Sequence, residues 1–500
     1  MIIEDVERPP LSADLSVGTE WHESNNLDFR ALDESSDQAI LDSDDRSGFA
    51  FTSIDSNIIF DAHPQVRFNI QPSHRGLWGG DQLGMTSAFG GWVFVRGLNT
   101  EIRFAEGDQA LKLTAGRQNF NLGGLPTDEF IFRDHIDGIR LDKPITGFGT
   151  LTFMPIEVPG QASTDDDIVF ARFVAQRGSS PFNFRGDTMT RRHGLIITMD
   201  DLVEGLDARG YGFYTDIGAM GSGADISYDG NLGNFSDNDW VANTGIRAAY
   251  EFGPVTPFAS FDASVGVDRK ELVARDANMN GFALLGGVSV DTRNDSDEDT
   301  VGVLAVADFF TALGPAYGND GLMFSHGYVG LKAQHIGGWL TSRFMGWHPT
   351  SYVGSWGLAE DIHMRDRKAG TQVIHAEGTV HFPGPLHIQA GFWNMTDTGF
   401  TELNIANVDT IDPPFGYSRD EFRAEERLGK SLGNEINMRL GYSRVMDGNT
   451  AEPLHIDFSL VGAVFLPGAF YDIPVSRVAG NHLGGQEIGW AASATSRVWF

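Results

Sequence analysis

The last residues of the chain, 488–500, alternate between apolar and polar positions up to the final residue. One face carries Ile488, Trp490, Ala492, Ala494, Val498 and Phe500, and only Ser496 interrupts it. Successive side chains of a β-strand point to opposite faces, so this period of two indicates a strand with one apolar face. A strand that ends the chain on an aromatic residue is typical of a closed membrane barrel, in which the last strand pairs with the first. The alternative is an edge strand of a soluble β-sandwich.

The same two-faced pattern recurs along the chain. Between 432 and 442, Ile436, Met438 and Leu440 alternate with polar residues. Further segments of this kind lie at 66–70, 101–104, 169–173, 240–251, 329–332, 374–382 and 454–460. No helical segment is available to cover these apolar faces, which leaves lipid as their covering. The sequence therefore predicts an all-β protein, a single-chain transmembrane antiparallel β-barrel of the bacterial outer membrane.

Composition supports one large barrel more than several soluble domains. The chain of 500 residues contains 61 Gly and 36 Phe but only 20 Pro and no Cys. Its most apolar stretch, 460–470, is much shorter than the ~20 residues that a transmembrane helix needs. We expect a single domain over 1–500, with 1–11 as the candidate for a periplasmic extension.

Connections between the strand-like segments alternate between short and long. Short turns fall at 105–108, 142–144, 252–254 and 382–385, and long connections at about 33–47, 177–191, 218–237, 348–370 and 396–431. This alternation is typical of short periplasmic turns and long extracellular loops. Candidate strands number roughly 16 to 20, and 18 is the even number that fits best.

The formal net charge of -32 is concentrated in acidic clusters. They lie at 33–45, 165–167 and 291–299, between strand-like segments. A surface this acidic repels phosphate backbones, so nucleic acid is excluded as a partner. If the clusters belong to extracellular loops, divalent cations there would bridge them to lipopolysaccharide; plain solubility of exposed loops is the alternative. The expected surroundings are therefore outer-membrane lipid and lipopolysaccharide, with no other cofactor.

Four short motifs resemble the alginate export family of outer-membrane barrels. They are Gly116-Arg117-Gln118-Asn119-Phe120, Asp137-Gly138-Ile139-Arg140-Leu141, Leu432-Gly433-Asn434-Glu435-Ile436-Asn437 and Phe465-Leu466-Pro467-Gly468-Ala469-Phe470, followed by the aromatic terminus. The resemblance implies a porin-like barrel of about 18 strands whose polar lumen conducts a hydrophilic solute. An alginate conduit would present an arginine-dominated pore to its polyanion. The charges here are mixed, which speaks against alginate itself.

Polar positions opposite the apolar faces are expected to line the lumen. The predicted solute-contacting residues are Arg67, Arg103, Arg140, Arg172, Arg247, Lys332, Glu377, Glu435, Arg439 and Asp457, with Glu101 and Glu251 as further inward acids. Charges of both signs on neighbouring strands also brace a barrel wall through cross-strand pairs, and for each residue this role competes with solute contact. The near balance of signs predicts weak ion selectivity, slightly in favour of anions, because a pore selects by its local field.

Signatures of catalysis and metal binding are absent from the sequence. No GxSxG, HExxH or GxxxxGK[ST] motif occurs. The segment 276–281 opens like a calcium loop, but Gly287 stands where a bidentate Glu is required. We therefore expect no enzyme and no metal, although a barrel protease or lipase with catalytic residues at the rim is an alternative.

The function predicted from the sequence is a passive channel, or porin, for small hydrophilic solutes or a saccharide. The alternative is a scaffold barrel, plugged by its own loops, that serves attachment or assembly with a partner. The sequence leaves the oligomeric state open.

Overall fold

The computed structural model describes most of the chain. The described residues are 11–25, 46–78, 92–105, 107, 109–121, 133–159, 191–217, 239–268, 277–293, 300–314, 316–318, 323–328, 330, 338–343, 370–401, 429–446, 453–469, 475–478, 481–483 and 488–500. Within this part of the chain, no helix is both long enough and apolar enough to cross a membrane.

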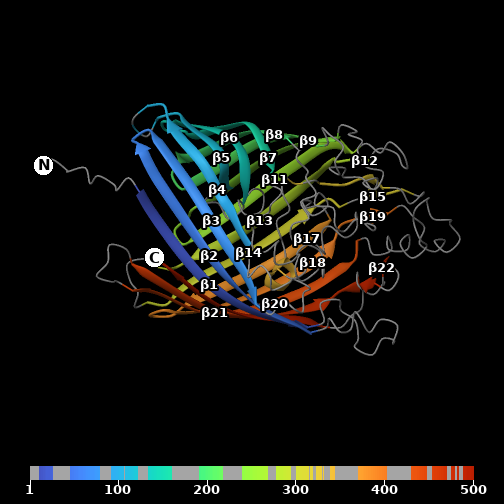
Figure 1. Ribbon diagram of the computed structural model, residues 1–500. Coiled ribbons are helices and arrows are strands. Elements are labelled where there is room, and N and C mark those ends of the chain that lie inside the picture. Colours follow the sequence, from blue (N-terminus) through green and yellow to red (C-terminus); the bar gives the residue numbers. More distant parts are fainter. Residues whose placement is uncertain are drawn as a thin grey trace.

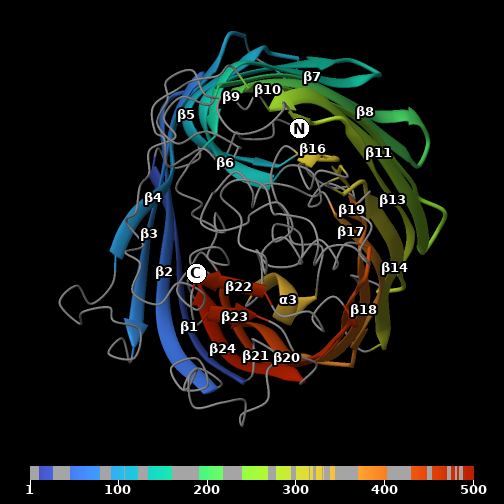
Figure 2. The same ribbon diagram turned by 90° about the vertical axis from the view of Figure 1, so that its right-hand side faces the viewer.

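Eighteen antiparallel strands of the described chain form one closed ring (Figures 1 and 2). In order around the ring they are β1 (Leu11–Asn25), β2 (Arg46–His63), β3 (Val66–Trp78), β4 (Trp92–Arg103), β5 (Lys112–Asn121), β6 (Arg133–Ile145), β7 (Gly149–Pro159), β8 (Arg191–Val203), β9 (Leu206–Ile217), β10 (Asp239–Tyr250), β11 (Val255–Asp268), β13 (Gly281–Asp291), β14 (Gly302–Ala312), β17 (Thr371–His381), β18 (Leu386–Asp397), β20 (Ser431–Met446), β21 (Leu454–Pro467) and β24 (Gly489–Trp499). The predicted fold class and strand number are confirmed.

The ring closes between the two ends of the chain. β24 pairs with β21 on one side and with β1 on the other, with Trp499 opposite Ser16. Beyond the last paired residue, Phe500 and Leu15 exchange two backbone hydrogen bonds of 3.0 Å. The alternating C-terminal segment is therefore the closing strand. Closure leaves no unpaired strand edge, which is the condition for a sheet in lipid.

Short and long connections separate to the two ends of the barrel. The turns at 204–205, 251–254 and 382–385 lie at the end where β1 begins and β24 ends, whereas the connections 26–45, 160–190, 218–238 and 398–430 leave the other end. Gly384 has a φ of 89°, a left-handed conformation that a tight turn needs and that glycine adopts without strain. The separation matches the predicted periplasmic turns and extracellular loops.

Asp291, which begins the acidic cluster at 291–299, lies at the opposite end from the prediction, and residues 294–299 lie outside the described residues. Asp291 closes β13, and its neighbour Val290 pairs with Val255 beside the 251–254 turn. The β13–β14 connection, which contains 292–301, therefore leaves the barrel at the periplasmic end. Its acidic composition resembles that of a long loop, and sequence alone did not reveal that its flanking strands run the other way. The clusters at 33–45 and 165–167 lie outside the described residues.

The outward positions form the apolar surface that the alternation predicts. Along β20, Ile436, Met438 and Leu440 are exposed, and the alternate positions Glu435 and Asn437 are buried. Exposed apolar side chains of this kind occur on strands all around the ring, including Phe68, Ile246, Phe261, Ile374 and Leu460. Because the ring is closed and its outer face is apolar, the barrel belongs in the outer membrane.

Several aromatic residues lie near the ends of the wall strands. Trp240 and Trp490 are close to the loop ends of β10 and β24, and Tyr250 and Phe500 lie at the turn end. Tyr442 lies within β20 near its turn end, and the centres of the Tyr442 and Phe458 rings are 6.2 Å apart. These positions fit aromatic residues at both membrane interfaces.

Several short elements lie outside the ring order. They are β12 (Ala277–Asn278), β15 (Ala316–Tyr317), β16 (Met323–Ser325), α3 (Trp339–Arg343), β19 (Phe400–Thr401), β22 (Val475–Val478) and β23 (Asn481–Leu483). Figure 2 shows α3, β16, β22 and β23 inside the outline of the barrel. The strands β7 and β8 pair directly, as do β14 and β17. The strands predicted at 169–173 and around 329–332 are therefore not interposed between these wall strands, and most of their residues lie outside the described chain.

Candidate functional site in the lumen

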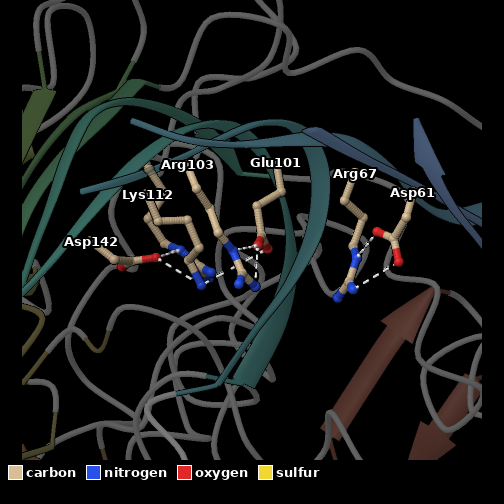
Figure 3. Close-up of polar contacts among 7 residues, drawn as sticks. Asp61, Arg67, Glu101, Arg103, Lys112 and Asp142 are labelled. Carbon is tan, nitrogen blue, oxygen red and sulfur yellow. Dashed lines mark hydrogen bonds and ion pairs between the residues drawn. The ribbon is translucent and has the colours of Figure 1, made fainter. Parts of the chain in front are cut away.

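A row of charged side chains follows the inner wall near the turn end, across β2 to β6 (Figure 3). We call it the charge ladder. Arg67 donates two hydrogen bonds to Asp61, of 2.7 and 3.1 Å. Arg103 donates to Glu101 at 3.0 Å, and Lys112 lies 4.0 Å from the same carboxylate.

Asp142 ends the ladder as its most connected carboxylate. It accepts hydrogen bonds from Arg140 at 2.9 Å and from Thr152 at 2.8 Å, and Lys112 lies 3.4 Å away. The rungs come from adjacent strands because Glu101, Lys112 and Asp142 take inward positions near the same end of β4, β5 and β6. Arg67 thus links β3 to β2, and Lys112 links β5 to β4 and β6, whereas Arg103 and Arg140 pair with carboxylates of their own strands.

The ladder is nevertheless accessible to solutes. The side chain of Arg103 is 50% exposed and those of Arg67 and Lys112 about a third exposed (32% and 31%). Ion pairs this exposed contribute little to stability, at most about 1 kcal/mol. Their hydrogen-bonding groups remain available to water or a polar solute in the lumen.

Arg247 lies in a buried cluster instead of a solute path. Its side chain and that of Asp262 are both 0% exposed, with 3.2 Å between Nη2 and Oδ1. The hydroxyl of Tyr211 donates to the same carboxylate at 2.6 Å, and the guanidinium lies 4.7 Å from the centre of the Tyr211 ring. Gly245 makes room, because a Cβ there would lie 2.1 Å from Asp262 Oδ1. Burial makes Arg247 a structural contact in this arrangement, and solute contact at Arg247 stays an untested prediction.

Part of the inner wall is apolar and covered, contrary to the expected polar lumen. Phe258, Leu285 and Phe310 take inward positions on β11, β13 and β14 and are buried. The non-wall residues Met279 and Tyr328 are 0% exposed, and the backbone N–H of Tyr328 donates to Leu313 at the loop end of β14. Segments inserted from the loop side therefore pack against this sector. The alternation of the strands could not reveal them.

Glu435 holds the helix α3 against the wall. Its Oε1 accepts from the backbone N–H of Leu340 at 2.6 Å, and its Oε2 accepts from the N–H and hydroxyl of Thr341 at 2.9 and 2.6 Å. Glu435 is 0% exposed. Trp339, the first residue of α3, stacks on His22 of β1, with 6.5 Å between the centres of the two rings. The predicted solute contact of Glu435 is thus replaced by a contact with an inserted helix, which we call the α3 latch.

Three further predicted residues lie on the inner wall of β17 to β21. Glu377 accepts a hydrogen bond of 2.5 Å from Gln389 on the next strand. Asp457 accepts one from Ser443. Arg439 takes an inward position on β20, between buried Asn437 and Gly441, and is half-buried. These three residues remain candidates for solute contact.

The structure says less about the remaining predicted residues. Arg172 and Lys332 lie outside the described residues. Glu251 is exposed in the turn after β10. No group of three or more His, Asp or Glu able to hold a metal occurs in the described part of the chain.

The first two family-like motifs pair with each other in the structure. β5 and β6 bring Arg117 opposite Asp137, with two hydrogen bonds of 2.9 and 2.7 Å. Alternation with the buried Gln118 and Ile136 puts this pair on the outer side of the wall. The motifs therefore mark a pair of wall strands and add no residue to the lumen.

Sequence reasoning missed a cavity of about 620 Å³ at the barrel seam, where β24 meets β1. Its lining includes Arg96, Arg497, Asp14 and Asp55 together with Trp499. Arg497 lies on the inward face of β24, away from the apolar face, and the alternation of the strand could have indicated this inward position. The closure of the ring then brings Arg497 beside residues from the other end of the chain.

Comparisons with known proteins find the same kind of fold only at low similarity. No family profile matches the sequence, so the resemblance to the alginate export family rests on its four motifs alone. No curated protein matches either. Among solved structures, a BenF-like porin from Pseudomonas fluorescens Pf-5 is 10% identical, with a TM-score of 0.46 and coverage of 98% of both chains. The outer membrane protein OpdK from Pseudomonas aeruginosa is 10% identical, with a TM-score of 0.46 and coverage of 98% of this chain and 99% of that one. Wzi from Escherichia coli, a carbohydrate-binding β-barrel involved in capsule assembly, is 10% identical, with a TM-score of 0.42 and coverage of 97% of this chain and 84% of that one.

Proposed function

We propose that the protein is a passive outer-membrane channel for small hydrophilic solutes. The observation that carries this proposal is the charge ladder. It places ionised, partly exposed side chains on the inner face of a closed ring, whereas a completely filled barrel would bury or replace them. Its hydrogen-bonding groups replace part of the hydration of a passing solute.

The charges of the ladder favour weak selectivity. Among the described residues it contains four cationic side chains, Arg67, Arg103, Lys112 and Arg140, against three carboxylates, Asp61, Glu101 and Asp142. Charges of both signs within a few ångströms nearly cancel beyond the Debye length of ~10 Å. We expect a slight preference for anions and no strong exclusion of either ion. A saccharide is a compatible solute, and alginate is a less suitable one because the wall is not dominated by arginine.

A plugged scaffold barrel is the second candidate, and the α3 latch favours it. An inserted helix held against the wall between β20 and β1 narrows the lumen, and complete filling would leave only surface attachment or assembly as functions. The acidic clusters at 33–45 and 165–167 would then be surfaces for divalent cations and lipopolysaccharide.

Conductance in planar bilayers separates the two candidates. The full chain is reconstituted after folding has been verified by circular dichroism and by heat-modifiable migration on gels. Stepwise conductance, with a small reversal potential of anion-selective sign in a salt gradient, supports the channel. A folded barrel that leaves the bilayer at its baseline conductance refutes the channel and supports the scaffold.

A further inference from the structure

The cavity at the barrel seam, the seam cavity, contains charged groups that do not neutralise one another. It lies towards the turn end and takes its lining from β1, β2, β3, β4, β21 and β24. A volume of about 620 Å³ falls in the range of small-molecule sites, roughly 300–1,000 Å³. It is a separate feature from the charge ladder, which continues along the wall to Asp142 on β6.

Arg497 is the cation of this cavity without a partner. It makes no hydrogen bond or ion pair with any residue that the structure describes, and its Nε is buried. Its cross-strand neighbours are Asp457 on β21 and Gly18 on β1. A Cβ at Gly18 would lie 2.7 Å from Ser53 Oγ and 3.5 Å from Arg497 Nε, so glycine leaves room for the guanidinium at this position. Buried donors of this kind require an acceptor, supplied by water or by a solute.

Two carboxylates of the cavity also lack a basic partner. Asp14 accepts a hydrogen bond of 3.4 Å from Asn57, and Asp457 accepts one from Ser443. Neither forms an ion pair among the described residues. Asp55 differs, because Arg96 lies 3.3 Å from it. The cavity therefore presents one guanidinium and two carboxylates whose charges remain available.

A stacked pair of rings completes the lining. The rings of Trp499 and His455 stack with centroids 5.1 Å apart and an angle of 9° between their planes. Stacking fixes the orientation of both rings, so their edges form a rigid, mostly apolar wall beside Arg497. The carbon skeleton of a small solute fits against such a wall while its charged ends reach the polar groups.

We propose that the seam cavity binds small zwitterions of the amino-acid class. The carboxylate of the solute pairs with Arg497, and its ammonium group with Asp457 or Asp14. A zwitterion satisfies charges of both signs without adding net charge to the cavity. A simple anion would leave the two carboxylates without a cationic partner, and a neutral sugar would leave both carboxylates and the guanidinium without a charged partner. The proposal rests on the channel function, since the site would act on a solute entering or leaving the lumen at its periplasmic end.

The test is a saturation measurement on the reconstituted full chain. L-glutamine is the zwitterionic probe, and lactate, n-butylamine and glucose represent an anion, a cation and a neutral solute. We expect glutamine to reduce the ion current in a saturable manner, with a half-saturating concentration at least tenfold lower than that of the other three. R497Q and D457N should each raise that concentration at least tenfold, with D14N giving a smaller rise.

The matched control is R293Q, which also removes one cation at the turn end. Arg293 is paired with Asp291 and lies outside the seam cavity. R293Q should leave the half-saturating concentration of glutamine unchanged. Equal saturation by lactate, with no effect of D457N or D14N, would overturn the zwitterion class. Loss of thermal stability in R497Q with unchanged glutamine saturation would show that Arg497 only braces the seam, which also overturns the proposal.

Calorimetry in detergent distinguishes failure of this site from failure of the channel. If the folded protein conducts no ions, glutamine is titrated into the solubilised protein. Heat of binding that disappears in R497Q retains the site and refutes only the channel. Absence of such heat in the folded wild-type protein refutes the site.

Discussion

At the scale of single residues, burial decides which charged side chains are structural. Arg67 and Arg247 are both inward arginines paired with an aspartate, and the sequence did not distinguish them. Arg67 is a third exposed and keeps much of its hydration, whereas Arg247 and Asp262 have none. Removing one partner of a fully buried pair leaves an uncompensated charge, which costs far more than removing one from an exposed pair.

R247M is therefore expected to destabilise the barrel strongly. The predicted loss of unfolding free energy is about 3–5 kcal/mol, because Asp262 stays buried without its cation. R67M, which removes the same group from the ladder, should cost at most about 1 kcal/mol. Urea unfolding in detergent micelles, followed by tryptophan fluorescence, measures both. Equal losses for the two variants would contradict the assignment of different roles.

At the scale of elements, the α3 latch joins a helix of the loop side to a wall strand. Three donors from residues 340 and 341 converge on one carboxylate. Gly338 fits only because it lacks a side chain, since a Cβ there would lie 2.4 Å from the Glu435 carboxylate. The latch should therefore be disrupted by a substitution either at Glu435 in the wall or at Gly338 beside the helix.

E435A is expected to release α3 from the wall. Leaving buried donors unsatisfied costs about 1–3 kcal/mol, which corresponds to an increase of roughly five- to 150-fold in the open population. Because the chain contains no cysteine, L340C provides a single thiol at a fully buried position. The thiol should react slowly with a water-soluble maleimide in the L340C parent and at least about fivefold faster in L340C/E435A.

Two further variants examine the specificity of this effect. L340C/G338A should also react faster, because the added methyl group displaces the helix while Glu435 remains. L340C/E377A removes an inward carboxylate that does not contact α3 and should react as slowly as the parent. Fast labelling in L340C/E377A, or slow labelling in L340C/E435A, would refute the latch.

At the scale of the whole molecule, closure makes the barrel stable in lipid. β24 satisfies the backbone groups of β21 and β1 at once. Without it two strand edges face hydrocarbon, where each unsatisfied backbone group costs several kcal/mol. The ends of the chain therefore depend on each other although they are farthest apart in sequence.

Deletion of 488–500 is expected to abolish the folded barrel. Deletion of 1–10 should leave it intact, because β1 begins at Leu11. Refolding into lipid vesicles, followed by heat-modifiable gel migration, reports the folded fraction of each protein. A folded band for the C-terminal deletion would show that the ring does not require β24, and loss of the band for the N-terminal deletion would mean that 1–10 contributes to the fold.

The sequence by itself determined the class of this protein. Period-two alternation in segments such as 432–442 and 488–500 identifies strands with one lipid face, because side-chain direction in a strand is a local property. Local alternation also assigned Arg67, Arg103 and Arg140 to the inner wall. It assigned Glu435 and Arg247 there too, but it carried no information on what lies opposite them.

Only the tertiary structure decided what the inward residues do. α3 reaches Glu435 from about ninety-five residues away in the chain, and Arg497 meets Gly18 only because the ring closes. The end of the barrel at which the 291–299 cluster lies likewise depends on counting every strand before it. These contacts depend on long-range topology and on inserted segments, which leave no periodic trace in the sequence.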